Sequence, residues 1–200
     1  MFSLEQGKKL VELARHSIET CFSKEKIELA DYKKEFSRKQ GVFTTLSMIG
    51  ELRGCIGFPE PTHPLYRAVF EAARSAAFED PRFPPLGKDE LHDLEIEVSV
   101  LTVPEPIAAD DPKEYPENIE IGKDGLIIRG KFGSGLLLPQ VPVEWGWDAE
   151  EFLKHIGIKA GLGEDAWKNP ENKLYRFQAQ IFSEKEPNGE VVEKEFDQDG

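Results

Sequence analysis

Apolar residues recur at helical spacing in several parts of the chain. Ser3 and Gln6 have the spacing of a capping box, which predicts a helix start near the N-terminus. The apolar stripe expected on this first helix comprises Leu4, Val11, Ala14, Ile18 and Cys21. Cys21 is therefore expected in the core.

Similar spacing predicts further helices over residues 28–39 and over 62–78, where Pro64 suits the first turn. The buried stripe expected on the latter helix comprises Leu65, Ala68, Val69, Ala72 and Ala76. Asp148 and Glu151 have capping-box spacing before another helix, which is expected to stop at Gly157.

Other segments have the alternation or the β-branched content of strands. Residues 41–58 read as a hairpin with a turn at Gly50-Glu51, and residues 94–101 alternate cleanly. A second hairpin is expected around "GKFGSG", and two strands are expected over residues 174–184 and 190–196. The predicted strands follow one another as hairpins, with helices between the hairpins. This order favours an α+β fold with antiparallel sheets.

The turn at Gly50-Glu51 sets the faces of the first hairpin, because side chains alternate along a strand. It places Leu46 opposite Cys55 and Met48 opposite Arg53. The apolar set expected on the core face comprises Phe43, Thr45, Ile49, Leu52, Ile56 and Phe58. Arg53, Cys55 and Gly57 then project from the other face, where the guanidinium favours the thiolate form of Cys55.

Two interpretations of Cys55 stay open at this point. In the first, Cys55 is a reactive thiol, and Gly54 and Gly57 leave space for a ligand to reach it. In the second, Cys55 packs as a small hydrophobic residue and Arg53 pairs with an acid.

Composition narrows the classes of function. The net charge is −13, and no basic stripe stands out, so nucleic-acid binding is disfavoured. No apolar run is long enough to span a bilayer and no signal-peptide pattern is present, which predicts a cytoplasmic protein without membrane contact. Two distant cysteines and four scattered histidines indicate no metal site. No cofactor signature is complete, so the cofactor is unknown.

The six residues "LRGCIG", Leu52 to Gly57, carry a resemblance. With "SAAFEDPRFPPL", "LEIEVSVL", "DGLIIRG", "GLLLPQVPVEWGWDAEEFL" and "LYRFQAQIFSE" in this order, the chain resembles the AMMECR1 family over residues 4–185. The resemblance implies two subdomains of unequal size, each with an antiparallel sheet and helices, and a cleft between them that the six-residue segment faces. The larger subdomain is expected to comprise residues 1–103 and 173–200, and the smaller one 104–172. The proline-rich stretch near 104 and the "KNPEN" turn near 170 mark the same boundaries independently.

The resemblance also implies a pathway shared with Memo-like and radical-SAM proteins, and two main functions compete. The first is an enzyme that acts on a sizeable substrate in the cleft, with Cys55 and Arg53 as the catalytic residues. The second is a non-catalytic module that binds a protein or another large partner there, while RNA binding is a third and weaker alternative. The residues expected to contact a ligand are Leu52, Gly54, Ile56, Gly57, Trp145 and Trp147.

Overall fold

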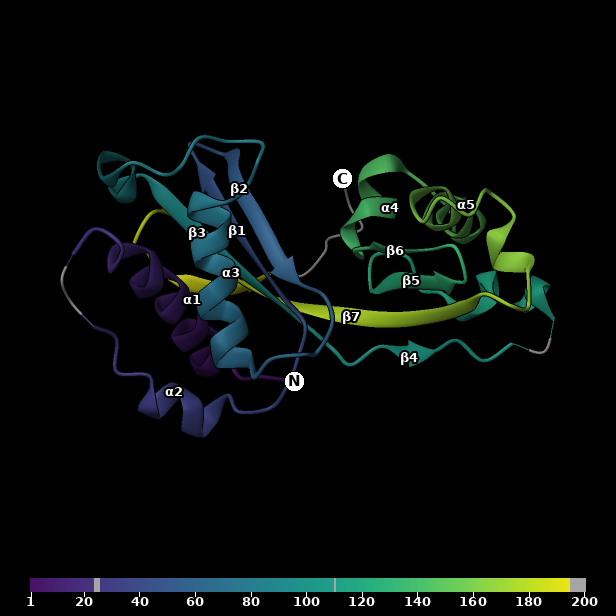
Figure 1. Ribbon diagram of the computed structural model, residues 1–200, viewed down its shortest axis with the longest axis horizontal. Helices are drawn as coiled ribbons and strands as arrows, with labels where there is room; N and C mark the ends of the chain where they lie inside the picture. The colour runs from purple at the N-terminus through teal and green to yellow at the C-terminus, as the bar shows by residue number, and fades with distance from the viewer. Residues whose placement is uncertain (24–25, 110, 195–200) are drawn as a thin grey trace. The chain divides into compact units, whose positions relative to one another are not determined.

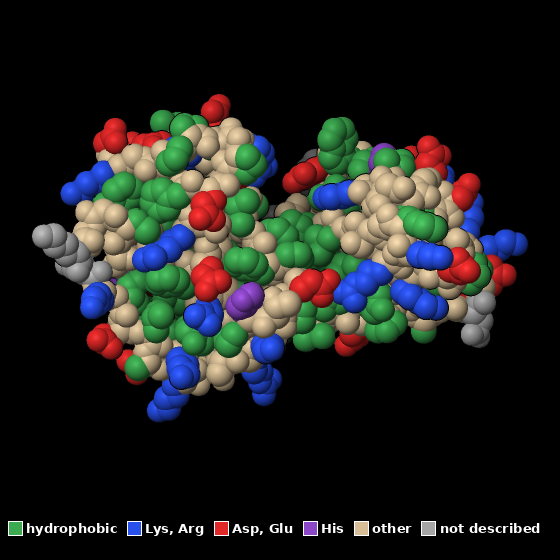
Figure 2. Space-filling model, in the orientation of Figure 1, with side chains coloured by type: hydrophobic (Ala, Val, Ile, Leu, Met, Phe, Trp, Pro, Cys, Tyr) green, Lys and Arg blue, Asp and Glu red, His purple; other side chains and the backbone are tan. Residues whose placement is uncertain are grey.

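The computed structural model describes residues 1–23, 26–109 and 111–194, and these divide into two compact units. Unit 1 comprises residues 1–101 and 180–194, and unit 2 comprises residues 102–179. Each unit combines helices with antiparallel strands (Figure 1), which confirms the α+β class. Basic, acidic and hydrophobic side chains are interspersed on the visible face of each unit (Figure 2). None of the helices in the described ranges is long and apolar enough to cross a membrane.

Unit 1 is a sheet covered on one face by helices. Its helices are α1 (Leu4–Glu19), α2 (Ala30–Glu35) and α3 (Leu65–Phe78), with the 3-10 turn η1 (Lys88–His92). Its strands are β1 (Val42–Met48), β2 (Glu51–Phe58), β3 (Leu94–Leu101), β8 (Val191–Lys194) and the part of β7 (Lys173–Glu184) from residue 180. Strands β2, β1 and β3 are neighbours in this order, which makes β2 an edge strand. Helix α3 packs on β1 and β2, and α1 packs on α3 and β3.

Helix α1 begins as the sequence predicts and ends earlier. The Ser3 hydroxyl accepts a hydrogen bond from the backbone N–H of Gln6, and the Gln6 side chain accepts one from the N–H of Ser3, so the predicted capping box is confirmed. The helix ends at Glu19, so the chain has already turned where Cys21 follows. Cys21 is exposed, and its predicted place in the core is wrong. The second predicted helix is also shorter than expected, since only α2 forms.

The apolar patterns of α3 and β3 were read correctly. The predicted stripe of α3 is buried in full and comprises Leu65, Ala68, Val69, Ala72 and Ala76. Leu94, Ile96, Val98 and Val100 of β3 are buried as well. These residues belong to one core cluster that also contains the buried side chains of α1.

The hairpin β1–β2 turns one residue earlier than predicted. Ile49 and Gly50 occupy the turn with φ values of 53° and 76°, because two residues with positive φ match the twist of a tight hairpin. Thr45 therefore lies opposite Cys55 and Leu46 opposite Gly54, while a β-bulge leaves Arg53 without a partner in β1.

This shift exchanges the two faces of β1. The buried residues of β1 are Val42, Thr44 and Leu46, rather than the predicted Phe43, Thr45 and Ile49. Ile56 and Phe58 pack against the core as expected. Leu52 and Ile49 were placed there too, but they are 44% and 88% exposed.

Unit 2 has its own sheet and its own core. Its strands are β4 (Glu105–Pro106), β5 (Asp124–Gly130), β6 (Gly133–Leu137) and β7 up to residue 179. Strand β7 pairs with β5 and with β4, and β5 pairs with β6 in the predicted second hairpin. Its helices are α4 (Gln140–Trp145) and α5 (Ala149–Lys159), with the 3-10 turns η2 (Pro112–Glu114), η3 (Pro116–Asn118) and η4 (Ala166–Lys168). A cluster that includes Leu126, Phe152 and Leu174 forms the core.

Helix α5 continues past the predicted stop. Asp148 caps its start by accepting a hydrogen bond from the N–H of Glu151, as expected. The helix runs through Gly157 and ends at Lys159, and Gly161 follows with a φ of 71°. The N–H of Leu162 donates to the carbonyl of Gly157, the closing bond of a Schellman motif, so Gly161 is the stop signal. The last predicted strand forms over β8, and its predicted residues 195 and 196 lie outside the described residues.

Candidate functional site

The backbone of Cys55 is held by two charged side chains at the outer edge of β2. An edge strand leaves alternate N–H and C=O groups without a strand partner. At Cys55 the N–H donates to Oδ2 of Asp80 at 2.9 Å, and the carbonyl accepts from Nη2 of Arg82 at 3.2 Å. Asp80 and Arg82 thus take the place of a neighbouring strand at this one residue.

Asp80 and Arg82 also bind each other tightly. Asp80 is 4% exposed, and its carboxylate accepts bonds from Nε and Nη2 of Arg82 at 2.9 and 2.7 Å. Hydrogen bonding from Arg82 holds the pKa of Asp80 well below its usual range, against the opposing effect of burial, and the N–H of Cys55 adds to the lowering. The pair is therefore ionised throughout the neutral range.

The Cys55 sulfur lies on the sheet face opposite to α3. Oγ1 of Thr45, across the hairpin, donates a hydrogen bond to Sγ at 3.4 Å. Hydrogen bonding to Asp80 is the main cause that raises the pKa of Arg82. The Arg82 guanidinium is bonded to the carbonyl of Cys55, so a cation lies at the same residue as the sulfur. Cys55 is half-buried and free of any disulfide.

The guanidinium of Arg53 is bonded to Glu90 and not to Cys55. Its Nε and Nη2 donate to the two carboxylate oxygens of Glu90 in η1, at 2.8 and 3.0 Å. This bidentate pairing lowers the pKa of Glu90. The Arg53 guanidinium lies 6.0 Å from the centre of the Phe83 ring, and that of Arg82 lies 5.5 Å from the same ring. Arg53 therefore has the acidic partner that the second interpretation of Cys55 expected.

The two glycines of the segment do not leave open space beside Cys55. A Cβ on Gly54 would overlap the backbone carbonyl oxygen of Ala76, because α3 approaches β2 closely there. A Cβ on Gly57 would overlap the ring of Phe43, which lies opposite it in β1. Helix packing and cross-strand aromatic packing therefore fill both spaces, and the prediction of ligand space at these glycines is wrong.

The remaining predicted site residues fall in different places. Gly54 and Ile56 pack toward the core of unit 1, whereas Leu52 is exposed. Trp145 and Trp147 belong to unit 2, whereas Cys55 belongs to unit 1. Sequence reasoning missed Thr45, Asp80, Arg82 and Glu90 as neighbours of the segment. The available signal was "EDPRF", in which an acid and an arginine directly follow the predicted end of α3.

Trp145 and Trp147 form an aromatic stack with His155. The Trp147 and His155 rings are 3.7 Å apart at an angle of 2°, and the two tryptophan rings are 6.0 Å apart at 20°. Trp147 packs against the core of unit 2, whereas Trp145 is 70% exposed. Of the two, Trp145 is the one available to a partner.

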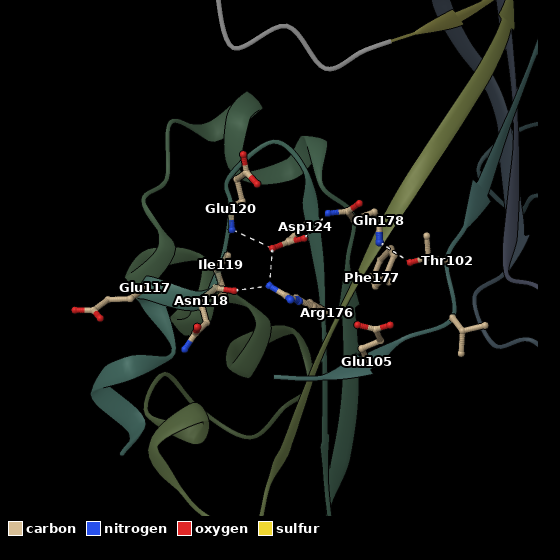
Figure 3. A pocket seen from close by; sticks show the side chains of 11 residues that line it. Thr102, Glu105, Glu117, Asn118, Ile119, Glu120, Asp124, Arg176, Phe177 and Gln178 are labelled. Atoms are coloured by element: carbon tan, nitrogen blue, oxygen red, sulfur yellow. Dashed lines mark hydrogen bonds and ion pairs between the residues drawn. The ribbon is translucent and has the colours of Figure 1, made fainter. Parts of the chain in front are cut away.

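A polar groove of about 720 Å³ lies wholly within unit 2. Its lining comes from the chain that leads into and begins β4, the η3 turn and the residues after it, the start of β5 and the middle of β7 (Figure 3). The lining residues are Thr102, Val103, Glu105, Glu117, Asn118, Ile119, Glu120, Asp124, Arg176, Phe177 and Gln178. Sequence reasoning missed this groove, because its side chains come from four separate segments.

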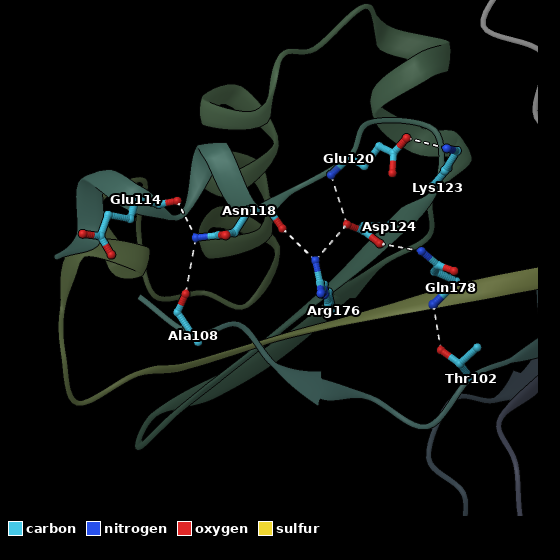
Figure 4. A network of polar contacts seen from close by, with 9 residues as sticks. All are labelled: Thr102, Ala108, Glu114, Asn118, Glu120, Lys123, Asp124, Arg176 and Gln178. Atoms are coloured by element: carbon cyan, nitrogen blue, oxygen red, sulfur yellow. Dashed lines mark hydrogen bonds and ion pairs between the residues drawn. The ribbon is translucent and has the colours of Figure 1, made fainter. Parts of the chain in front are cut away.

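A buried carboxylate organises the groove (Figure 4). Asp124 is 2% exposed and accepts hydrogen bonds from the N–H of Glu120 at 3.0 Å and from Nε2 of Gln178 at 3.2 Å. The N–H of Gln178 donates to the hydroxyl of Thr102 at 2.9 Å. Nη1 of Arg176 donates to the carbonyl of Asn118 at 3.1 Å and lies 3.9 Å from Asp124.

No group of three His, Cys, Asp or Glu side chains arranged to hold a metal ion occurs in residues 1–23, 26–109 and 111–194. The polar sites of the two units are thus built from paired charges and amides.

Comparison with known proteins places the chain in a family. The sequence profile of the AMMECR1 family matches residues 11–182. Protein MJ0810 of Methanocaldococcus jannaschii is 53% identical over 98% of both chains, and Protein MK0488 of Methanopyrus kandleri is 52% identical over 97% of this chain and 96% of that one. The crystal structure of the uncharacterized protein PH0010 from Pyrococcus horikoshii has 48% sequence identity and a TM-score of 0.86, covering 96% of this chain and 97% of that one. The chain belongs to the AMMECR1 family.

Proposed function

We propose that this protein is an enzyme whose nucleophile is the sulfur of Cys55. The observation that carries the proposal is that Asp80 and Arg82 fix the backbone of Cys55 on both sides of the residue. The sulfur itself accepts a hydrogen bond from the neutral hydroxyl of Thr45, and the Arg82 guanidinium is bonded to the carbonyl of the same residue. A nucleophile needs a fixed backbone, a reachable sulfur and a cation that favours the thiolate.

The reaction step follows from the thiolate. The Cys55 thiol releases its proton to water, and the thiolate attacks a doubly bonded, electrophilic carbon of the substrate. A carbon–sulfur bond forms, the π bond at that carbon breaks, and its electron pair moves to the neighbouring atom, which takes up the released proton from water. In this proposal Arg82 and Asp80 are positioning residues that hold the backbone of Cys55. Arg53 holds η1 in place through its ion pair with Glu90. A sizeable substrate, the cleft and a pathway link to Memo-like and radical-SAM proteins stay predictions tied to the family resemblance, and a cytoplasmic location stays a prediction from the composition.

A non-catalytic binding module is the second candidate, and one observation favours it. Both acids beside the segment, Asp80 and Glu90, are already bonded to arginines. Within the described ranges, the hydrogen bond to Sγ comes from a hydroxyl, which is a poor general base. A module of this kind would use the exposed ring of Trp145 as an anchor for a protein partner.

A ligand screen separates the two candidates. We would screen metabolites by thermal shift with the wild type and Cys55→Ser, and analyse each stabilising compound by intact-mass spectrometry. The proposal expects a compound that forms an adduct on Cys55 and stabilises the wild type but not Cys55→Ser. A ligand or protein partner that binds both forms equally, without an adduct, supports the binding module and contradicts the enzyme.

A further inference from the structure

The groove of unit 2 has more negative than positive charge. Its lining contains four carboxylates and a single guanidinium, that of Arg176. Lys123 pairs with Glu120 at 2.5 Å. Glu117 points away from the other labelled side chains in Figure 3. Glu105 and Asp124 are therefore the acids that contribute negative charge to the groove itself. Glu105 is exposed and lies opposite Arg176 in the β4–β7 pair, and its carboxylate has no hydrogen-bond or ion-pair partner among the described residues.

The amide side chains of the groove present acceptors. Nδ2 of Asn118 donates to the carbonyls of Glu114 and Ala108, at 2.9 and 3.3 Å, so its amide is oriented with Oδ1 left as the acceptor. Nε2 of Gln178 donates to Asp124, which likewise leaves Oε1 as the acceptor. Together with the Glu105 carboxylate, these groups are suited to a ligand that donates N–H bonds.

Arg176 does not neutralise Asp124 through a hydrogen bond. Its Nη1 donates to the carbonyl of Asn118 and stays 3.9 Å from the carboxylate, whose direct partners are a backbone N–H and an amide. The Arg176 guanidinium at 3.9 Å offsets part of the Asp124 charge. With the Glu105 carboxylate added, these three groups carry a net negative charge, so the potential in the groove is negative. That potential attracts a cation and repels an anion.

We propose that this groove binds a cationic nitrogen group, an alkylammonium or a guanidinium. Glu105 supplies the opposite charge, and the amide oxygens of Gln178 and Asn118 accept the N–H bonds. The same chemistry is carried by a free polyamine and by the lysine or arginine side chains of a peptide. Because the groove is open to water, the affinity is modest and falls with salt. This site is independent of Cys55.

The test is an amide NMR titration of the full chain with two probes, spermidine and a short arginine-containing peptide, at 50 and 300 mM salt. Variants Glu105→Gln and Glu105→Lys change an exposed side chain, so both are expected to fold. Glu144→Gln, an exposed acid of unit 2 outside the groove lining, is the control with the same change of net charge.

The proposal expects saturable shifts confined to residues 102–105, 118–125 and 176–178. Binding should weaken about three- to fivefold in Glu105→Gln, weaken further in Glu105→Lys, and stay unchanged in Glu144→Gln. Whichever probe binds more tightly identifies the source of the cationic group. Shifts spread over the whole acidic surface, equal losses in Glu105→Gln and Glu144→Gln, or no binding at millimolar concentrations would overturn it.

Discussion

Cys55 illustrates how one residue combines a fixed backbone with a reachable side chain. Its N–H and C=O are taken by Asp80 and Arg82 at the edge of β2, and its sulfur is on the face opposite to α3. The sequence suggested Arg53 as the cation beside the thiol, because residues two apart on a strand share a face. The β-bulge at Arg53 breaks that alternation, and Glu90 binds the guanidinium instead. A bulge leaves no clear sequence signal, so the loss of alternation at Arg53 could not be predicted.

Replacing Asp80 is expected to change the acid sensitivity of folding. The pKa of Asp80 is lower in the folded protein than in the unfolded chain. Its contribution to stability is therefore full above its unfolded pKa, near pH 4, and is lost as the pH falls through the folded value. Asp80→Asn should lower the free energy of unfolding by about 2 kcal/mol at pH 7, and by less at pH 3.

Urea unfolding between pH 3 and pH 7 measures this difference. Asp93→Asn, which removes an acid whose side chain is 48% exposed, is the control and should change stability little at either pH. A gap between wild type and Asp80→Asn that is the same at every pH would show that the pair does not act through the ionised carboxylate.

Ile49 is a second residue at which the sequence disagrees with the local backbone. It is 88% exposed and has a φ of 53°, a conformation that β-branched residues disfavour. Asn-Gly is the preferred pair for this turn, so Ile49→Asn should raise the free energy of unfolding by about 1 kcal/mol. Val103→Asn also removes an exposed apolar side chain, without a positive φ, and should change stability little. An unchanged or lower stability of Ile49→Asn would contradict the turn assignment.

At the scale of elements, the sequence predicted those with a long apolar period and failed at their ends. The helix α3 and the strand β3 were found in full, because each buries one continuous apolar face. The prediction extended helix α1 to Cys21 and ended α5 at Gly157. The error at Gly157 arises because a glycine inside a helix looks the same in a sequence as a glycine that ends one. The first turn was displaced by one residue for a similar reason, because Gly50 fits two adjacent turn positions. That single displacement assigned the wrong face of β1 to the core.

The contact of β2 with α3 gives an element-scale prediction. Gly54→Ala would place a methyl group against the carbonyl of Ala76, and a backbone atom cannot rotate away as a side chain can. The free energy of unfolding should fall by about 1–3 kcal/mol, the usual cost of overpacking. Gly87→Ala is the matched control, since the added Cβ there meets the flexible end of the Asp89 side chain. Equal effects of the two substitutions in urea unfolding would refute the close approach of α3.

At the scale of the whole molecule, the two units each have their own core, and a continuous strand, β7, runs through both. Limited proteolysis of the native protein should cut first near Thr102 to Pro104, because this crossing is largely exposed, whereas the crossing at residue 179 lies within β7. Mass spectrometry of the first fragments identifies the cut. A first cut inside α1 or α3, or uniform hydrogen-exchange protection through residues 102–104, would contradict this expectation.

The reactivity of Cys55 tests the central claim of a functional thiol most directly. The measurement is the rate of alkylation by iodoacetamide between pH 6 and pH 9 in a Cys21→Ser background, since Cys21 is exposed and would react as well. We expect native Cys55 to react faster than a model thiol at neutral pH. The rate should fall several-fold in Arg82→Gln, recover in part in Arg82→Lys, and stay nearly unchanged in Arg53→Gln. A Cys55 that reacts only after unfolding, or a rate that responds to Arg53 and not to Arg82, would contradict the account.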